Sequence, residues 1–135
     1  MDDVAIPQTT EDVIARSTFL RAGPFVYVRA GAVHHPESHL LVTHDDRETT
    51  VVTTEAQLGD VEVLERNQDR WTLFAIDCAN PFYCVGFIAK ISARLSGAGL
   101  DILVVSTFSR DWVLVKEDDA ERAEELLVAM GFTPR

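Results

Sequence analysis

The sequence has 135 residues, of which 47% are hydrophobic, and a formal net charge of -10. This composition can bury a core, and the acidic charge argues against nucleic acid or an anionic membrane as a partner, because both attract basic proteins. No apolar run approaches the roughly 18 residues that span a bilayer, and the acidic, polar start MDDVAIPQTTED is unlike a signal peptide. We therefore expect a cytoplasmic protein.

The first quarter of the chain predicts one strand and little helix. Thr10 can cap a short helix, although a loose terminus fits residues 1–16 equally well. The alternating segment PFVYVRA, residues 24–30, is the first predicted strand. After it, Gly31 and Pro36 leave room for one or two helical turns or a bare loop.

The next segment predicts a hairpin followed by a boundary. Strands over 40–44 and 49–54 flank turn-forming aspartates, and an alternating strand is expected over 61–65. Residues 55–58 can begin a short helix that Gly59 stops. The polar, turn-prone 67–69, Asn-Gln-Asp, is the best candidate for a linker between two halves.

The second half predicts strand, helix, two strands and helix. WTLFAIDC, residues 71–78, is a strand, and Ile88, Ile91 and Leu95 give residues 85–97 the apolar spacing of a helix. Glycine tolerates the left-handed turn at helix ends, so Gly99 and Gly131 are expected to close the two helices. The other expected features are strands over 100–107 and 111–116, a hairpin turn at 108–110, and a capping box of Asp118 and Glu121 at the last helix.

A motif in this half resembles the ACT-domain superfamily, and most closely small tandem ACT-domain proteins. The matching residues are Gly86, Ile88, Ala89, Ser106, Thr107, Phe108, Asp111, Trp112, Leu114, Val115 and Lys116. The resemblance covers about half of the chain and implies an α+β fold with antiparallel sheets. It suggests two ACT-like, ferredoxin-like βαββαβ units, a degenerate one over 1–66 and a second over 67–135. It also implies a regulatory or sensory role without catalysis.

Two features predict that the halves share strands. The segments 102–105 and 112–115 are apolar on both faces, so the face away from the helices must be covered by the other half or by a second subunit. Little chain remains after Gly131 for a fourth strand, so we expect 61–65 or 25–29 to lie beside 112–115. The same reasoning leads us to expect a homodimer with strands 100–107 and 112–115 near its interface.

A ligand site is expected where the 77–87 loop enters the helix and meets the turn at 106–111. Free N–H groups at a helix start attract a carboxylate, and Asp111 can hold an ammonium group, which together suit an amino acid. The expected ligand-binding residues are Asn80, Phe82, Val85, Gly86, Phe87, Ser106, Thr107 and Asp111. The alternative is that these residues only cap and pack the turns, and that the protein is a structural dimerisation or interaction module without a ligand.

No motif indicates catalysis, a metal or a cofactor. His35 and His39 have helical chelate spacing, but Pro36 lies between them, so a surface cluster is expected. Ser106 has no histidine or lysine nearby in sequence, and the chain has no GxSxG motif. Cys78 and Cys84 lack CxxC spacing and are expected as buried thiols near one loop.

Overall fold

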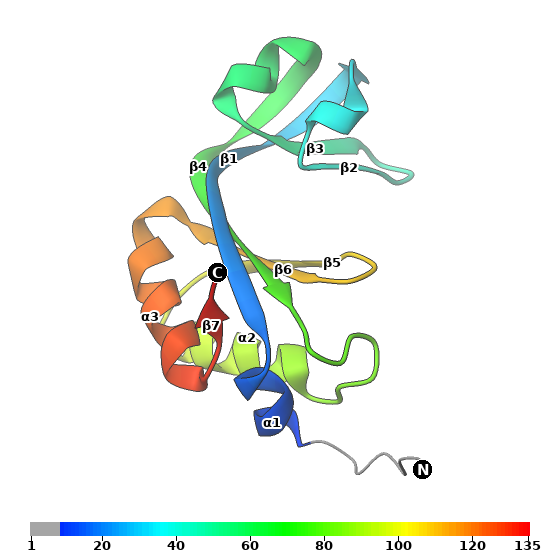
Figure 1. Ribbon diagram of the computed structural model, residues 1–135. Helices are drawn as coiled ribbons and strands as arrows, with labels where there is room; N and C mark the ends of the chain where they lie inside the picture. Colours follow the sequence, from blue (N-terminus) through cyan, green and yellow to red (C-terminus); the bar gives the residue numbers. More distant parts are fainter. Residues whose placement is uncertain (1–8) are drawn as a thin grey trace.

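Two long antiparallel strands, β1 (Thr18–Val33) and β4 (Val61–Asp77), form the centre of the sheet, and the other strands lie on either side of this pair (Figure 1). The computed structural model describes residues 9–135. The strand order is β2-β3-β1-β4-β6-β5, and β7 pairs with the start of β1. The remaining elements are α1 (Thr10–Ala15), β2 (Leu41–His44), β3 (Thr49–Thr53), α2 (Phe87–Gly97), β5 (Ile102–Ser106), β6 (Asp111–Lys116), α3 (Ala120–Met130), β7 (Thr133–Pro134) and three short 3-10 helices.

Strand β1 is longer than predicted, and its first part completes the sheet of the second half. Residues 18–22 pair with 73–77 of β4, while 26–30 pair with β3. Strand β6 therefore lies between β4 and β5. Because both of its edges are paired, it does not pair with 25–29 or 61–65. The predicted sharing of strands between the halves is correct, but the predicted donor segments are wrong. Periodicity missed 18–22 because Gly23 and Pro24 interrupt the pattern.

Both long strands change register where they bend. At Gly23 φ is +137°, and an added Cβ would lie 3.2 Å from the Trp71 carbonyl oxygen, so glycine suits this position. On β4, three residues, 67–69, lie opposite the single residue Tyr27. The predicted linker at 67–69 is therefore wrong, because these residues form a bulge inside a continuous strand.

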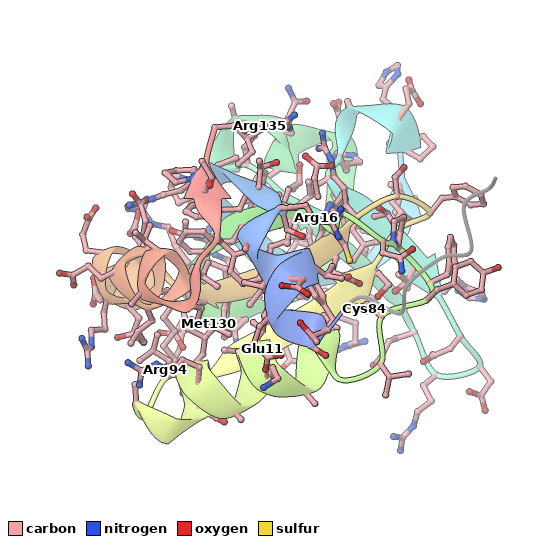
Figure 2. The ribbon with its side chains drawn as sticks, turned by 60° about the horizontal axis from the view of Figure 1, so that its bottom comes forward. Glu11, Arg16, Cys84, Arg94, Met130 and Arg135 are labelled. Carbon is pink, nitrogen blue, oxygen red and sulfur yellow. The ribbon has the colours of Figure 1, made fainter. Side chains whose placement is uncertain are left out.

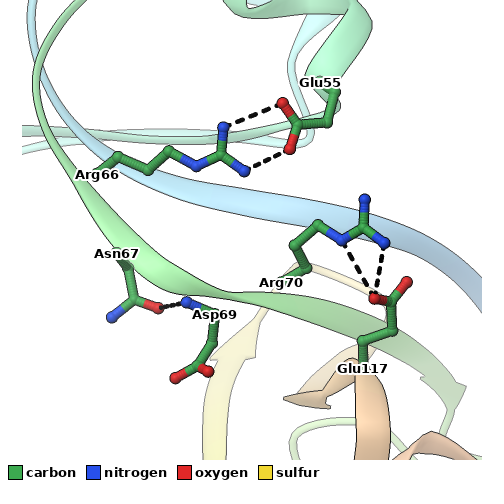
Figure 3. Close-up of polar contacts among 6 residues, drawn as sticks. All are labelled: Glu55, Arg66, Asn67, Asp69, Arg70 and Glu117. Atoms are coloured by element: carbon green, nitrogen blue, oxygen red, sulfur yellow. Dashed lines mark hydrogen bonds and ion pairs between the residues drawn. The ribbon is translucent and has the colours of Figure 1, made fainter.

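Asn67 organises this bulge (Figure 3). Its Oδ1 accepts a hydrogen bond from the Asp69 N–H at 3.0 Å. The same oxygen accepts a second one from the Trp71 indole Nε1–H at 3.1 Å. Two ion pairs flank the bulge, one between Arg66 and Glu55 and the other between Arg70 and Glu117. These contacts use the polar side chains that make the segment resemble a linker.

The three α-helices of the described chain cover one face of the second half's sheet (Figure 1). Phe19 and Phe74 pack edge to face, with ring centroids 5.7 Å apart, under α3 and α1. Gly99 and Gly131 have positive φ after their helices, as predicted. The predicted capping box is wrong, because Asp119 is the N-cap of α3 and makes no side-chain cap bond. The buried residues of this core are Val13, Ile14, Phe19, Phe74, Ile76, Cys78, Phe87, Ile91, Leu95, Leu100, Val113, Val115, Ala120, Ala123, Leu126, Leu127 and Phe132.

The opposite face is covered by the first half of the same chain. Figure 1 shows the β2–β3 and β5–β6 hairpins projecting to the same side of the long strands. Val52 from β3 and Leu114 from β6 belong to one buried cluster with Trp71 and Leu73, and Trp112 packs partly against it. The sequence predicted that either the other half of the chain or a second subunit covers this apolar face. In the structure, the other half covers it.

The first half repeats the strand pattern of the second with 3-10 helices in place of α-helices. Pro36–Ser38 lies between β1 and β2, and Glu55–Asp60 lies between β3 and β4. This order agrees with a degenerate βαββαβ unit, but the tandem organisation and the division at residue 66 stay predictions. Among residues 9–135, no helix has the length and apolar character that a membrane span requires.

Candidate functional site

A small open cavity lies where β4 ends, α2 begins and β6 starts. Its volume is about 260 Å³, slightly below the roughly 300–1,000 Å³ of pockets that hold drug-sized ligands. A ligand with few heavy atoms therefore suits it. Figure 2 shows Cys84 on the loop that leads into α2. The lining residues are Cys78, Asn80, Phe82, Cys84, Gly86, Phe87, Ile88, Ala89 and Asp111.

The N-terminus of α2 forms one wall of this cavity. Gly86 is the N-cap, with φ of 86°, and it has no side chain to satisfy the first-turn N–H groups. Within the described chain, the Phe87 N–H reaches the Cys84 carbonyl at 3.3 Å, while Ile88 and Ala89 have no backbone acceptor outside the helix. Such groups, with the positive end of the helix dipole, favour an anion.

Asp111 supplies a carboxylate on the facing wall. It is the first residue of β6, and its Oδ1 accepts a hydrogen bond from the Ser106 hydroxyl at 2.7 Å. No ion pair to Asp111 occurs within residues 9–135, so its negative charge is available to a cation in the cavity.

The neighbouring Asp77 differs, because two arginines neutralise it. Arg110 Nε donates to its Oδ1 at 2.9 Å, and Arg135 Nη2 lies 3.0 Å from its Oδ2. The second contact lacks hydrogen-bond geometry, so it is an ion pair only. Asp77 therefore ties the end of β4 to the β5–β6 turn and to the C-terminal residue.

Five of the eight predicted site residues line the cavity: Asn80, Phe82, Gly86, Phe87 and Asp111. The other three do not. Val85 is 94% exposed, and its carbonyl accepts from the Thr10 hydroxyl at 2.9 Å. The Thr107 hydroxyl accepts from the Arg110 N–H within the turn, and Ser106 reaches the site only through its bond to Asp111.

Four lining residues were not among those predicted: Cys78, Cys84, Ile88 and Ala89. The last two contribute through the backbone of the helix start, where their side chains give no signal. The two cysteines could have been predicted from the sequence, because they lie at the two ends of the loop that leads into the helix.

An exposed aromatic group stands beside the cavity mouth. Phe82 is 70% exposed, Tyr83 81% and Phe108 85%. The rings of Phe82 and Phe108 meet edge to face at 5.3 Å, so the loop before α2 touches the β5–β6 turn. Phe82 has φ of 69°, which is unusual for a residue with a side chain.

The histidines form no metal site in the part of the chain that the structure describes, where no cluster of three or more potential ligands occurs. His34, His35 and His44 lie at the surface. His39 is buried, so the predicted surface cluster of histidines is wrong at this residue. Its Nδ1 lies 2.8 Å from the Thr53 hydroxyl, and its Nε2 lies 3.0 Å from the His34 carbonyl. Both ring nitrogens of His39 therefore make polar contacts within the first half of the chain.

Comparison with known proteins identifies the architecture. Residues 66–129 match the family model described as the ACT domain. The chain has an ACT-type fold. No curated protein matches the sequence. The family match supports the resemblance noted from the motif, whereas the tandem and amino-acid-sensor parts of that resemblance stay predictions.

Solved structures share this ACT-type fold. A Vibrio cholerae protein of unknown function, described as a possible transport protein, superimposes with a TM-score of 0.73 and 17% identity, covering 90% of this chain and 94% of that one. A protein from Agobacterium tumefaciens gives 0.68 and 25% identity, covering 88% and 90%. Aspartate kinase from Clostridium acetobutylicum, described as an allosteric enzyme, gives 0.61 and 15% identity; 82% of this chain covers only 34% of the kinase.

Proposed function

We propose that this protein is a non-catalytic regulatory or sensory protein of the cytoplasm that binds an amino acid in the cavity at the start of α2. The observation that carries the proposal is that the N-terminus of α2, which has no side-chain cap, shares one small cavity with the Asp111 carboxylate, which forms no ion pair within residues 9–135. An amino acid zwitterion needs one anion-binding and one cation-binding group at short range, and the two walls offer both.

Each part of the ligand then has a partner. The α-carboxylate accepts from the N–H groups of Ile88 and Ala89, and the α-ammonium donates to Asp111. Gly86 has no Cβ, so the ligand can approach the helix start closely. Asn80 and Phe82 lie at the cavity rim and contact the ligand's side chain. Ser106 acts indirectly by fixing the rotamer of Asp111.

The comparisons support a regulatory role in general terms. The matched family is the ACT domain, and one similar structure is described as a putative regulatory domain of an aspartate kinase, with a TM-score of 0.54 and 14% identity. Those likenesses concern the fold, so the ligand rests on the geometry of the cavity.

A thermal-shift screen of the common amino acids tests the proposal. At 100 times its dissociation constant a ligand adds about 2.7 kcal/mol of stability, which raises the melting temperature by several degrees. Asp111→Asn should abolish the response. Asp118→Asn removes the same charge from an exposed position, so it should keep the response.

A flat screen with folded protein would contradict the ligand and favour the second candidate, a structural dimerisation module without a ligand. The exposed Phe82, Tyr83 and Phe108 favour that candidate, because large exposed apolar groups are typical of interaction surfaces.

We also propose a homodimer with β5 near its interface. Strand β5 pairs only with β6 and leaves its outer edge unpaired in the described chain, and such edges attract further strands. Val104 on this edge is 39% exposed, and Val63 on β4 is 41% exposed. Val104→Glu should lower the mass measured by light scattering to that of a monomer, whereas Val63→Glu should not. A folded wild-type monomer at micromolar concentration would refute the dimer.

A further inference from the structure

Two thiols line the candidate cavity from opposite ends of one short loop. Cys78 follows the last residue of β4, and Cys84 lies two residues before the N-cap of α2. Both residues line the same 260 Å³ cavity, and neither forms a disulfide in this structure. The proposed ligand contacts use neither cysteine.

The ends of this loop are anchored by hydrogen bonds to the segment 10–17, whereas its middle makes weaker contacts. The Ala79 N–H donates to the Ser17 hydroxyl at 2.9 Å, and the Thr10 hydroxyl donates to the Val85 carbonyl at 2.9 Å. Between them, the middle of the loop has a long side-chain hydrogen bond from the Asn80 amide to the Tyr83 carbonyl at 3.4 Å, and the ring contact of Phe82 with Phe108. Residues 80–83 can therefore adjust while both cysteines stay at the cavity wall.

The two cysteines differ in access, and this difference sets the order of reaction. Cys78 is 8% exposed and Cys84 is half-buried. Burial raises the pKa of the Cys78 thiol, the Asn80 backbone N–H lowers it, and the nearby Cys84 and Asp111 raise it, with a net upward shift. Because a reagent from solution reaches the half-buried Cys84 more readily than the buried Cys78, Cys84 reacts first and Cys78 second.

We propose that Cys78 and Cys84 form a reversible disulfide across the 79–83 loop by exchange with a small disulfide such as oxidised glutathione. The Cys84 thiolate attacks one glutathione sulfur, the S–S bond breaks, and one glutathione leaves as a thiolate that takes up a proton. The Cys78 thiolate then attacks the Cys84 sulfur and expels the second glutathione. Two protein thiols are oxidised to one disulfide, and one glutathione disulfide is reduced to two thiols.

The disulfide changes the cavity because it joins two of its walls. The bond holds the two Cβ atoms about 3.5–4.5 Å apart, so it fixes the separation of two residues that line the cavity. It also restrains Asn80 and Phe82, which lie between the cysteines. Oxidation should therefore weaken ligand binding. This effect on binding rests on the proposed function, whereas the thiol chemistry does not.

Intact-mass measurement of the full chain after incubation with oxidised glutathione tests the thiol pair. Wild-type protein should lose two hydrogen atoms, carry no glutathione, and yield a cross-linked Cys78–Cys84 peptide that dithiothreitol separates. Cys78→Ser should stop at one glutathione adduct on Cys84. Cys84→Ser should keep its buried thiol unmodified in the native state. Circular dichroism checks that both variants are folded, and the wild-type result stands without them.

Three results would overturn the inference: a wild-type protein that keeps both thiols, one that stops at a glutathione adduct, or one that links two chains. A second arm compares the thermal shift by the bound amino acid in oxidised and reduced protein. Loss of the shift on oxidation of the wild type, with recovery after dithiothreitol treatment, supports the coupling to binding. An unchanged shift refutes the coupling. A reduced protein that responds to no amino acid refutes the proposed function and leaves the disulfide result intact.

Discussion

Replacing Phe19 tests whether β1 completes the sheet of the second half. Phe19 is 1% exposed and packs edge to face on Phe74, 5.7 Å away between centroids. Phe-to-Ala changes in cores cost about 3–5 kcal/mol, and the lost aromatic pair accounts for roughly 0.5–1.5 kcal/mol beyond area burial. Against a total stability of about 5–15 kcal/mol, Phe19→Ala should lower the melting temperature by about 10 °C or more.

The matched control is the next residue on the same strand. Leu20 is 40% exposed and lies on the other face, so Leu20→Ala should cost about 1 kcal/mol or less. Urea unfolding followed by the fluorescence of Trp71 and Trp112 measures both variants. Equal losses for the two variants would refute the reasoning, because burial of residue 19 would then play no part in holding 18–22 against β4.

Three further predictions follow from other contacts. Asn67→Ala should cost about 1–3 kcal/mol in urea unfolding, because the Trp71 indole N–H loses its acceptor in a partly buried site; a smaller change than for an exposed Gln68→Ala control would contradict this. The isolated fragment 67–135 should give a poorly dispersed NMR spectrum, since it lacks α1 and β1, and a cooperative, well-dispersed fragment would disprove the shared sheet. The hydrogen bond from Lys90 lowers the pKa of Glu11, so the ion pair's contribution to stability is complete above the ordinary glutamate pKa and is lost as pH falls through the lowered one. Lys90→Met should return the Glu11 pKa, measured by carboxyl NMR, toward its ordinary value, and an unchanged titration would exclude the contact.

Local sequence patterns predicted only some of the residues at the candidate site. Asp111 and Gly86 could be predicted, because a helix start and a hairpin turn are local features with characteristic residues. Ser106 and Thr107 were expected to face the ligand, but their hydroxyls satisfy Asp111 and the turn instead. The hydrogen-bond partner of a hydroxyl group depends on its rotamer and on its neighbours in space. The residue type specifies neither of them. The pairing of Cys78 with Cys84 across a cavity likewise needed the path of the loop.

By itself, the sequence determined the local elements of this protein. The apolar spacing of Ile88, Ile91 and Leu95 predicts α2, the positive-φ glycines at 99 and 131 end the two helices, and the alternating hairpin strands appear close to where they were expected. These features depend on residues a few positions apart. The doubly apolar strands also indicated that their second face is covered, either by the first half or by a second subunit, and the structure has the first half there.

Only the tertiary structure decided how the strands are joined. It extended β1 back across Gly23 and Pro24 to Thr18, made 67–69 a bulge inside β4 instead of a linker, and placed β6 between β4 and β5. Strand partners such as Phe19 and Ile76 are far apart in sequence, and the backbone groups that join them are the same in every residue. The choice among such partners is therefore made by the burial of both faces of the whole sheet, which no local pattern contains.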